Sequence, residues 1–424
     1  MLFRQFLDIC NQHELISGCC FESEQFFKLI HNNLNCYGRS LDFLEYHKQI
    51  SLKFLVGLSV VFLFGILIFG LSPNGFNFSN GVNWITDQPG IRFNKYGIAY
   101  TNPFFEWTGD NISKPNCFSI EIALKPAGYH TKSTNFILAL HDGRDRNQLL
   151  MWQYYSWIIL MNGDDYDHKR RTKRIAVEIA SLSPTTRFLT IATGQEGTEV
   201  YLDGQFVSRK KELTLKIPNG SKTRLLLGNS VYGKQPWHGD IYGLAFYGYT
   251  LTAQDAAFHF DRWVRVQDFS FAKKDKPSVL YFFDEKEGLR ALDHAGGNHH
   301  LEIPLKMQIL EREILSLPWS TLKFNRSFIK DIVLNLLGFI PFGFVLSATL
   351  IKLGGTFEKN DVLITVVLCF TLSFIIEIVQ AWIPSRSSHM LDLILNTLGA
   401  LIGALVYRFF IVRIYSKRGL KASA

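Results

Sequence analysis

The stretch Asp331-Ile-Val-Leu-Asn335-Leu-Leu-Gly338 opens the first of three apolar segments near the C-terminus. The segments cover residues 331–351, 362–383 and 390–412, and each is long enough, at roughly 20 residues, to cross a bilayer as a helix. Residues three and four apart share a helix face, so polar residues at that spacing predict a polar stripe on each helix. The stripes consist of Asp331, Asn335 and Gly338; Ser373, Glu377 and Gln380; and Asp392, Asn396, Gly399 and Gly403.

A carboxylate inside a membrane costs about 3 kcal/mol at the helix centre, and it normally faces other helices, water or a partner. We therefore expect the three stripes to meet in one polar site near the outer face of the membrane. Arg386, in the loop before the last segment, would serve there as a counter-charge or phosphate contact. The spacing leaves open whether this site binds a ligand, catalyses a reaction or only fixes helix packing. Its predicted members are Asp331, Asn335, Glu377, Gln380, Arg386, Asp392 and Asn396.

These residues carry a resemblance to the VanZ-like family of bacterial membrane proteins. The resemblance rests on Asp331-x3-Asn335-x2-Gly338-x2-Pro341-Phe342-Gly343, on Ser373-x3-Glu377-x2-Gln380-x3-Pro384-x-Arg386, on Asp392-x3-Asn396-x2-Gly399-x3-Gly403, and on the preceding Leu317-Pro318-Trp319. It implies a multi-span membrane domain in a family named for low-level teicoplanin resistance. In this chain a long insert separates the first span from the other three, which departs from the family pattern.

The first span is predicted at residues 54–71, an uncharged run that is typical of an uncleaved signal anchor. The composition agrees with a membrane protein, since 47% of the residues are hydrophobic and only 19% are charged. The net charge is +8, but no basic helix, zinc-finger spacing or RNA-binding signature accompanies it. We therefore expect the lipid bilayer as a partner and no nucleic acid.

The basic residues near the predicted spans indicate the orientation. Lys352 and Lys359 lie in the loop between the second and third spans, and further basic residues follow the fourth span. Because basic residues near span ends favour the cytoplasmic side, both termini are expected in the cytoplasm and residues 72–330 outside.

The first 50 residues contain four of the six cysteines. Cys10, Cys19, Cys20 and Cys36 lie near two histidines, but their spacing fits no paired zinc signature. We therefore expect reduced thiols in a small cytosolic helical segment and no metal site.

The insert changes to short runs of β-branched and aromatic residues between turn residues. Residues 118–124, 135–140, 157–160 and 188–192 are predicted strands, and residues 198–207 predict a hairpin around Asp203-Gly204. Many short strands favour a sandwich or barrel. Residues 187–207, Leu225-Leu-Leu-Gly228, residues 238–247 and Leu251-Thr-x2-Asp255 resemble the ending of laminin-G and concanavalin A-like lectin domains, which implies a jelly roll.

Several insert residues are candidates for chemistry. Glu121 and Glu178 stand alone in strands and are interpreted as outward-facing surface residues, without the paired spacing of a glycosidase. Asp110, Asn111, Asp142 and Asp145 are interpreted as ordinary turn residues, with calcium ligation as the open alternative. We expect no other cofactor. The aromatic run 151–157 suits either sugar stacking or the sandwich core.

The predicted fold is mixed: a four-span α-helical transmembrane bundle with an all-β jelly-roll sandwich inserted between spans one and two. The domains are residues 1–50, a cytoplasmic segment; 51–72, the anchor; 73–305, the sandwich; 306–412, the VanZ-like domain; and 413–424, a basic cytoplasmic tail.

Two functions compete. The leading hypothesis is an envelope protein without enzymatic activity, whose sandwich binds a cell-envelope glycan or protein. The alternative is an intramembrane enzyme that acts on a lipid-linked substrate at the outer leaflet. A conduit through the bundle is a third hypothesis, and it would require a homo-oligomer because four spans are few.

Overall fold

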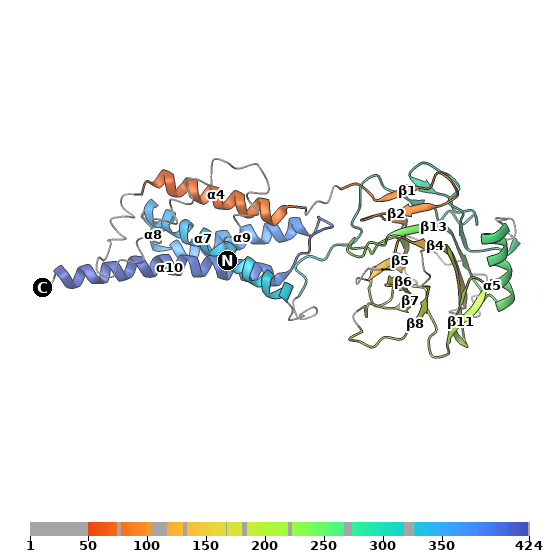
Figure 1. The fold of residues 1–424 in the computed structure, drawn as a ribbon. Coiled ribbons are helices and arrows are strands. Elements are labelled where there is room, and N and C mark those ends of the chain that lie inside the picture. The colour runs from red at the N-terminus through yellow and green to blue at the C-terminus, as the bar shows by residue number, and fades with distance from the viewer. Residues whose placement is uncertain are drawn as a thin grey trace. The chain divides into compact units, whose positions relative to one another are not determined.

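The structure is a computed structural model of the 424-residue chain (Figure 1). It describes residues 50–73, 78–102, 117–129, 134–166, 168–179, 185–218, 223–266, 274–317 and 326–422, with side chains from 329 to 410 in the last range. The cysteine-rich segment before residue 50, the pair Pro318-Trp319, and Asp110 and Asn111 lie outside the described residues. Contacts divide the chain into two units. One holds most of the helical residues, and the other holds the β-strands with residues 67–71, 372–380 and 390–393 of three helices.

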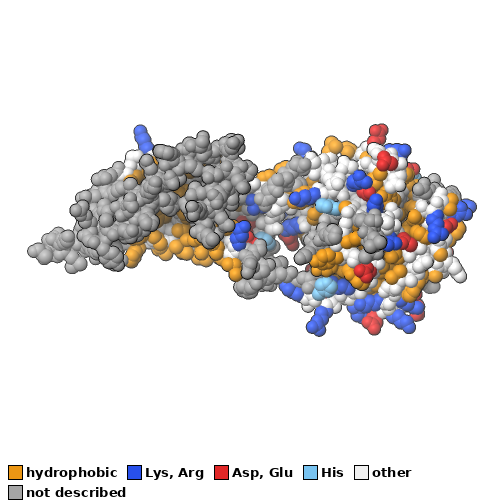
Figure 2. Space-filling model, viewed as in Figure 1, with side chains coloured by type: hydrophobic (Ala, Val, Ile, Leu, Met, Phe, Trp, Pro, Cys, Tyr) orange, Lys and Arg blue, Asp and Glu red, His pale blue; other side chains and the backbone are white. Residues whose placement is uncertain are grey.

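Four helices are long and apolar enough to cross a membrane, which confirms the predicted number of spans. They are α4 (Leu52–Leu71), α7 (Arg326–Leu353), α9 (Asp361–Gln380) and α10 (Met390–Ala422), and a short helix α8 (Thr356–Lys359) joins α7 to α9. Their apolar windows have mean hydropathies between 1.8 and 2.8. Many of their large apolar side chains are exposed, and Figure 2 shows hydrophobic side chains along the lower edge of the helical part. This surface suits a lipid environment.

Helices α7 and α10 approach each other closely through glycines. A Cβ atom on Gly403 would lie 2.1 Å from the carbonyl oxygen of Ile340, and one on Gly399 would lie 2.3 Å from that of Leu336. In the opposite direction, a Cβ on Gly343 would lie 2.3 Å from the carbonyl of Ala400. Gly399 and Gly403 of the predicted stripe on α10 therefore position these two helices together with Gly343, because only glycine admits such backbone contact.

The insert forms two antiparallel sheets, which confirms the predicted sandwich. The first sheet has the order β1-β2-β13-β4-β9-β10-β11, with β14 on β13, and the second has the order β15-β16-β3-β12-β5-β6-β7-β8. The strands are β1 (Val82–Trp84), β2 (Ile91–Phe93), β3 (Ala99–Thr101), β4 (Phe118–Pro126), β5 (Asn135–His141), β6 (Leu149–Tyr154), β7 (Trp157–Asn162), β8 (Arg174–Glu178), β9 (Arg187–Gly194), β10 (Gly197–Leu202), β11 (Gln205–Lys210), β12 (Arg224–Leu227), β13 (Gly239–Tyr247), β14 (Val279–Tyr281), β15 (Arg290–Ala291) and β16 (Leu301–Glu302).

The hairpin of β10 and β11 turns at the predicted dipeptide. Asp203 and Gly204 have φ values of 52° and 76°, the left-handed region that a tight two-residue hairpin turn requires. The turn fixes the pairing of Leu202 with Gln205. The local sequence thus sets the pairing next to the turn, and the register shifts once between Val200 and Tyr201, as at a β-bulge.

Alternate residues of the central strand β4 point into different apolar clusters. Ile120, Ile122 and Leu124 of β4 enter the core between the sheets, whereas Ala123 belongs to a second cluster on the outer face of the first sheet. The helix α5 (Ala253–Phe260) and the π-helix η1 (Asp261–Val266) contribute to that outer cluster. Helix α5 begins at a capping box between Thr252 and Asp255. The outer face of the first sheet is therefore covered at β4, β9, β13 and β14, whereas β11 is exposed.

Candidate functional site

Glu377 is the most buried acid of the predicted membrane site. Its side chain lies near the end of α9 and is 1% exposed. Its Oε2 atom accepts a hydrogen bond of 2.8 Å from the backbone N–H of His389, immediately before α10. Asp392 lies in the first turn of α10. The carboxylate of Glu377 therefore joins the end of one span to the start of the next.

Gln380 and Arg386 both bind the C-terminal end of α4. The Gln380 side-chain amide donates to the carbonyl of Gly70 at 2.7 Å, and the Arg386 guanidinium donates to the carbonyls of Phe69 and Ser72 at 2.8 Å each. The last carbonyls of a helix have no partner within it and favour a nearby cation. In the structure these two predicted site residues hydrogen-bond to the end of the anchor helix α4. Phosphate contact by Arg386 stays a prediction.

Four residues that were not predicted as site members form a connection beside Glu377. The Ser316 N–H donates to the carbonyl of Ser388 at 3.1 Å, and the Met390 N–H donates to the carbonyl of Ser316 at 3.2 Å. The Ser316 hydroxyl lies 2.6 Å from Nδ1 of His389. The run Ser387-Ser388-His389 between two spans was the available signal, but its partner lies 73 positions earlier in the sequence.

The other predicted members belong to the helical unit. Asp331 is exposed near the start of α7, Asn335 is half-buried one turn later, and Asn396 is 6% exposed on α10. Glu377, Gln380, Arg386 and Asp392 belong to the unit that contains the β-strands. A single site shared by all seven residues therefore stays a prediction.

An exposed row of side chains crosses the end of the second sheet. Tyr154 of β6 pairs with Trp157 of β7, and Trp157 pairs with Glu178 of β8. Residues directly opposite each other on antiparallel strands lie on the same face with their side chains in contact range. Tyr154 is 39% exposed and Trp157 is 40% exposed, and Glu178 is exposed as predicted. The row therefore offers two aromatic rings next to a carboxylate.

The remaining part of the aromatic run is buried. Met151, Trp152 and Gln153 are each at most 2% exposed, and the Gln153 amide oxygen accepts a 2.7 Å hydrogen bond from the Trp237 indole. The first part of the run therefore has the core role predicted for it, and sugar stacking by the run stays a prediction. Its first residues fill the core, and its last residues reach the surface.

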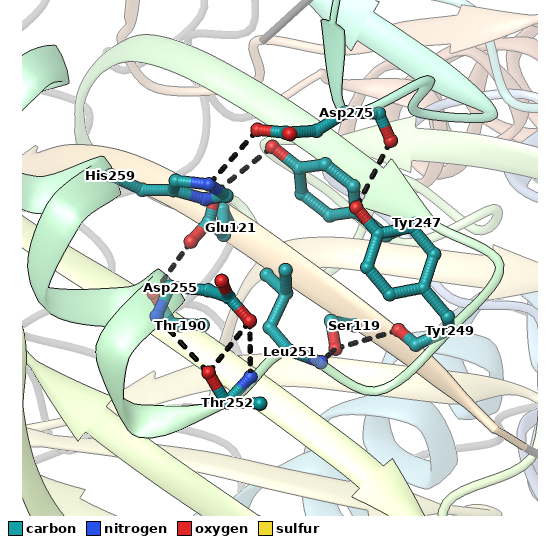
Figure 3. Close-up of polar contacts among 10 residues, drawn as sticks. All are labelled: Ser119, Glu121, Thr190, Tyr247, Tyr249, Leu251, Thr252, Asp255, His259 and Asp275. Atoms are coloured by element: carbon teal, nitrogen blue, oxygen red, sulfur yellow. Dashed lines mark hydrogen bonds and ion pairs between the residues drawn. The ribbon is translucent and has the colours of Figure 1, made fainter. Parts of the chain in front are cut away.

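The expectation that Glu121 faces outward is wrong. Glu121 is fully buried under α5, where its carboxylate accepts hydrogen bonds from Thr190 at 2.9 Å and Tyr247 at 3.1 Å (Figure 3). Its Oε2 atom also lies 2.9 Å from Nδ1 of His259, whose Nε2 lies 3.1 Å from Asp275. Strand alternation does place Glu121 away from the inter-sheet core, but α5 and η1 cover that face too. The carboxylate is therefore part of the outer cluster and not of an exposed catalytic groove.

The carboxylates proposed for calcium are occupied by protein donors where the structure describes them. Asp142 accepts from the Arg144 guanidinium at 3.1 Å and from the Asn147 amide at 3.2 Å. Asp145 accepts from Tyr232 at 3.0 Å and lies 3.2 Å from His141. Burial raises the pKa of Asp145, but these two hydrogen bonds and the charges of His141 and Arg170 together outweigh it and hold the pKa below its usual value. The contacts of Asp142 and Asp145 are therefore those of a hydrogen-bonded, charged loop.

A different group of possible ligand atoms lies in the last part of the sandwich. Asp284, Glu285 and His294 each place one nitrogen or oxygen within 4.8 Å of the others. Nε2 of His294 lies 3.4 Å from the Oδ1 atom of Asp284, which is within ion-pair distance. This group was not predicted from the sequence. Asp284 and Glu285 are adjacent, whereas His294 follows Glu285 by nine positions.

Family models match both parts of the chain. Residues 279–412 match the VanZ/LLP1 family, and residues 101–257 match the concanavalin A-like lectin/glucanases superfamily. The two matches confirm the two resemblances and their order along the chain.

Solved structures resemble the chain at low identity. A Bacteroides ovatus ATCC 8483 protein described as a candidate carbohydrate-binding protein is 15% identical, with a TM-score of 0.36 over 50% of this chain and 57% of that one. The binding domain of botulinum neurotoxin DC, solved with rat synaptotagmin II, is 13% identical, with a TM-score of 0.34 over 43% and 45%. The chain thus spans about half the length of each. The curated proteins gave no match. The chain is thus similar to the concanavalin A-like lectin/glucanases superfamily over residues 101–257 and to the VanZ/LLP1 family over residues 279–412, and four of its described helices are long and apolar enough to cross a membrane.

Proposed function

We propose that the sandwich binds a glycan of the cell envelope on the row formed by Tyr154, Trp157 and Glu178. The exposure of two neighbouring aromatic rings carries this proposal. Aromatic faces stack on the apolar C–H faces of sugar rings, and a carboxylate accepts hydrogen bonds from sugar hydroxyls. The superfamily that matches residues 101–257 includes lectins and glucanases, whose ligands are carbohydrates.

The helical part anchors this domain in the membrane. The basic residues Lys352 and Lys359 between α7 and α9 support a cytoplasmic position for that loop. The termini then lie in the cytoplasm and the sandwich lies outside, where envelope glycans occur. The VanZ resemblance adds an expected role in envelope maintenance or glycopeptide tolerance.

The contacts of Gln380 and Arg386 favour a packing role for the membrane polar residues over catalysis. Both side chains use their donors on backbone carbonyls of the anchor. The leading function is therefore binding, and an enzyme acting on a lipid-linked substrate remains the alternative hypothesis.

The test uses the full chain in detergent, with binding measured on a glycan array and on isolated cell-wall polymer. The double variant Tyr154→Ala/Trp157→Ala should lose at least about tenfold in affinity, since stacking is worth on the order of 1 kcal/mol per ring. Phe206→Ala is the matched control, because Phe206 is an exposed aromatic residue on β11. Equal loss in both variants, or binding unaffected by the double variant, would exclude this row as the glycan site.

A further inference from the structure

A groove of about 420 Å³ lies in the helical unit, between the start of α9 and α10. Its lining residues form two chemical groups. The polar group consists of Lys359, Asn360 and Arg408, and the apolar group consists of Val362, Leu363, Val366 and Leu401.

The two groups lie at opposite ends of the groove. Arg408 binds Asp361, the first residue of α9, so the polar end lies beside that helix start. Leu401 precedes Arg408 by two helical turns, or about 10 Å, and Val366 follows Asp361 by about 7 Å. Because Leu401 and Val366 line the same groove, the helices run antiparallel here and the groove becomes apolar away from Arg408.

The polar end carries an excess positive charge. Asp361 is fully buried, accepts a 2.6 Å hydrogen bond from the Ser347 hydroxyl and pairs with Arg408, so these two charges compensate each other. The Arg408 side chain is still 42% exposed. Lys359 is exposed, and no ion pair recorded within the described ranges includes it. The excess charge is therefore that of Lys359, next to a guanidinium that remains accessible.

We infer that this groove binds an anionic phospholipid, with its phosphate beside Lys359 and Arg408 and an acyl chain along Leu363, Val366 and Leu401. A soluble anion would use only the polar end, whereas a lipid matches both ends. The groove begins where a predicted span begins, so a phosphate there lies at headgroup depth. Basic residues between spans on the cytoplasmic side are a known type of lipid headgroup site.

The test measures lipid retention by the full chain, reconstituted in equal parts phosphatidylglycerol and phosphatidylcholine and analysed by native mass spectrometry. We expect phosphatidylglycerol to be retained in preference to phosphatidylcholine. Lys359→Gln should lower the apparent affinity about fivefold, which corresponds to about 1 kcal/mol for one lysine near an anionic surface. Lys53→Gln removes the same charge at an exposed site on α4 and should leave retention unchanged.

The apolar end is tested by Leu363→Trp, which adds bulk at a side chain that is 64% exposed. This variant should also reduce retention while the melting temperature stays near that of the wild type. Equal retention of both lipids, or equal effects of Lys359→Gln and Lys53→Gln, would overturn the inference. Displacement of the lipid by soluble glycerol phosphate would overturn it as well, because the site would then be a simple anion site.

Discussion

Nδ1 of His259 lies 2.9 Å from the Glu121 carboxylate, and the other ring nitrogen lies 3.1 Å from Asp275. An imidazole between two carboxylates is favoured in its protonated form, in which both nitrogens donate. The contact joins α5 to β4 across 138 positions of sequence. It therefore holds the covering helix on the first sheet by charge as well as by apolar packing.

The first prediction concerns pH. Burial by itself lowers the pKa of His259, but the hydrogen bond and charge of Glu121, with the charge of Asp275, outweigh burial and raise the pKa. A pKa raised on folding gives stability that is fully present below the unfolded value, about 6.5, and is lost as pH rises through the folded pKa. We expect thermal melting of the sandwich to show this loss, and His259→Gln to flatten it.

His168→Gln is the control for that experiment, since His168 is an exposed histidine of the same domain. This variant should keep the pH dependence of the wild type. If His259→Gln keeps it too, the Glu121 contact does not control the protonation of His259.

The second prediction concerns helix packing. Gly403→Ala places a methyl group 2.1 Å from the carbonyl of Ile340, so α7 and α10 must separate and the melting temperature should fall. Gly338→Ala is the matched control, because its Cβ meets no atom within 4 Å. The control should be neutral or stabilising by about 1 kcal/mol through helix propensity. Similar melting of both variants in detergent would contradict the close approach.

The third prediction concerns Asp361 and Arg408. Arg408→Met leaves the buried Asp361 carboxylate without its cation and should destabilise the helical unit by about 3 kcal/mol. Adding Asp361→Asn should restore much of this loss, because the uncompensated charge is removed. Chemical unfolding in detergent measures the cycle. Arg265→Met, at the exposed pair with Asp261, should cost at most about 1 kcal/mol, and a cost like that of Arg408→Met would argue against the buried charge as the cause.

The fourth prediction concerns orientation. Reporter fusions at Tyr46 and after Lys421 should both report the cytoplasm, and a fusion within residues 208–212, at the end of β11, should report the opposite side. The physical reason is the basic loop before α9, which resists translocation. An external C-terminus would refute the proposed topology.

Local sequence predicted the elements well where neighbouring residues determine them. The uncharged run before the insert became α4, and Asp203-Gly204 set the hairpin of β10 and β11. The small residues Gly399 and Gly403 were placed on a stripe by their spacing, and they do lie at the contact with α7. These features depend on hydrophobic length, turn geometry and helical period, all of which are properties of short segments.

The candidate sites were predicted only in part. The aromatic run indicated a surface for sugars, but only strand register shows that Tyr154, Trp157 and Glu178 form one row. Glu121 was expected at the surface, and α5 buries it. Arg386 was expected as a counter-charge or phosphate contact, which stays a prediction, and the sequence did not indicate the hydrogen bonds of its guanidinium to the carbonyls of Phe69 and Ser72.

The sequence by itself determined the four spans, the insert between them and the β-class of that insert, because apolar length and strand alternation are local properties. Only the tertiary structure decided which polar groups are buried and what they bind. Glu121 meets His259, and Arg386 meets the end of α4 more than three hundred positions away. Such contacts depend on which elements pack together in the folded chain, so neither partner is visible from the residues around the other.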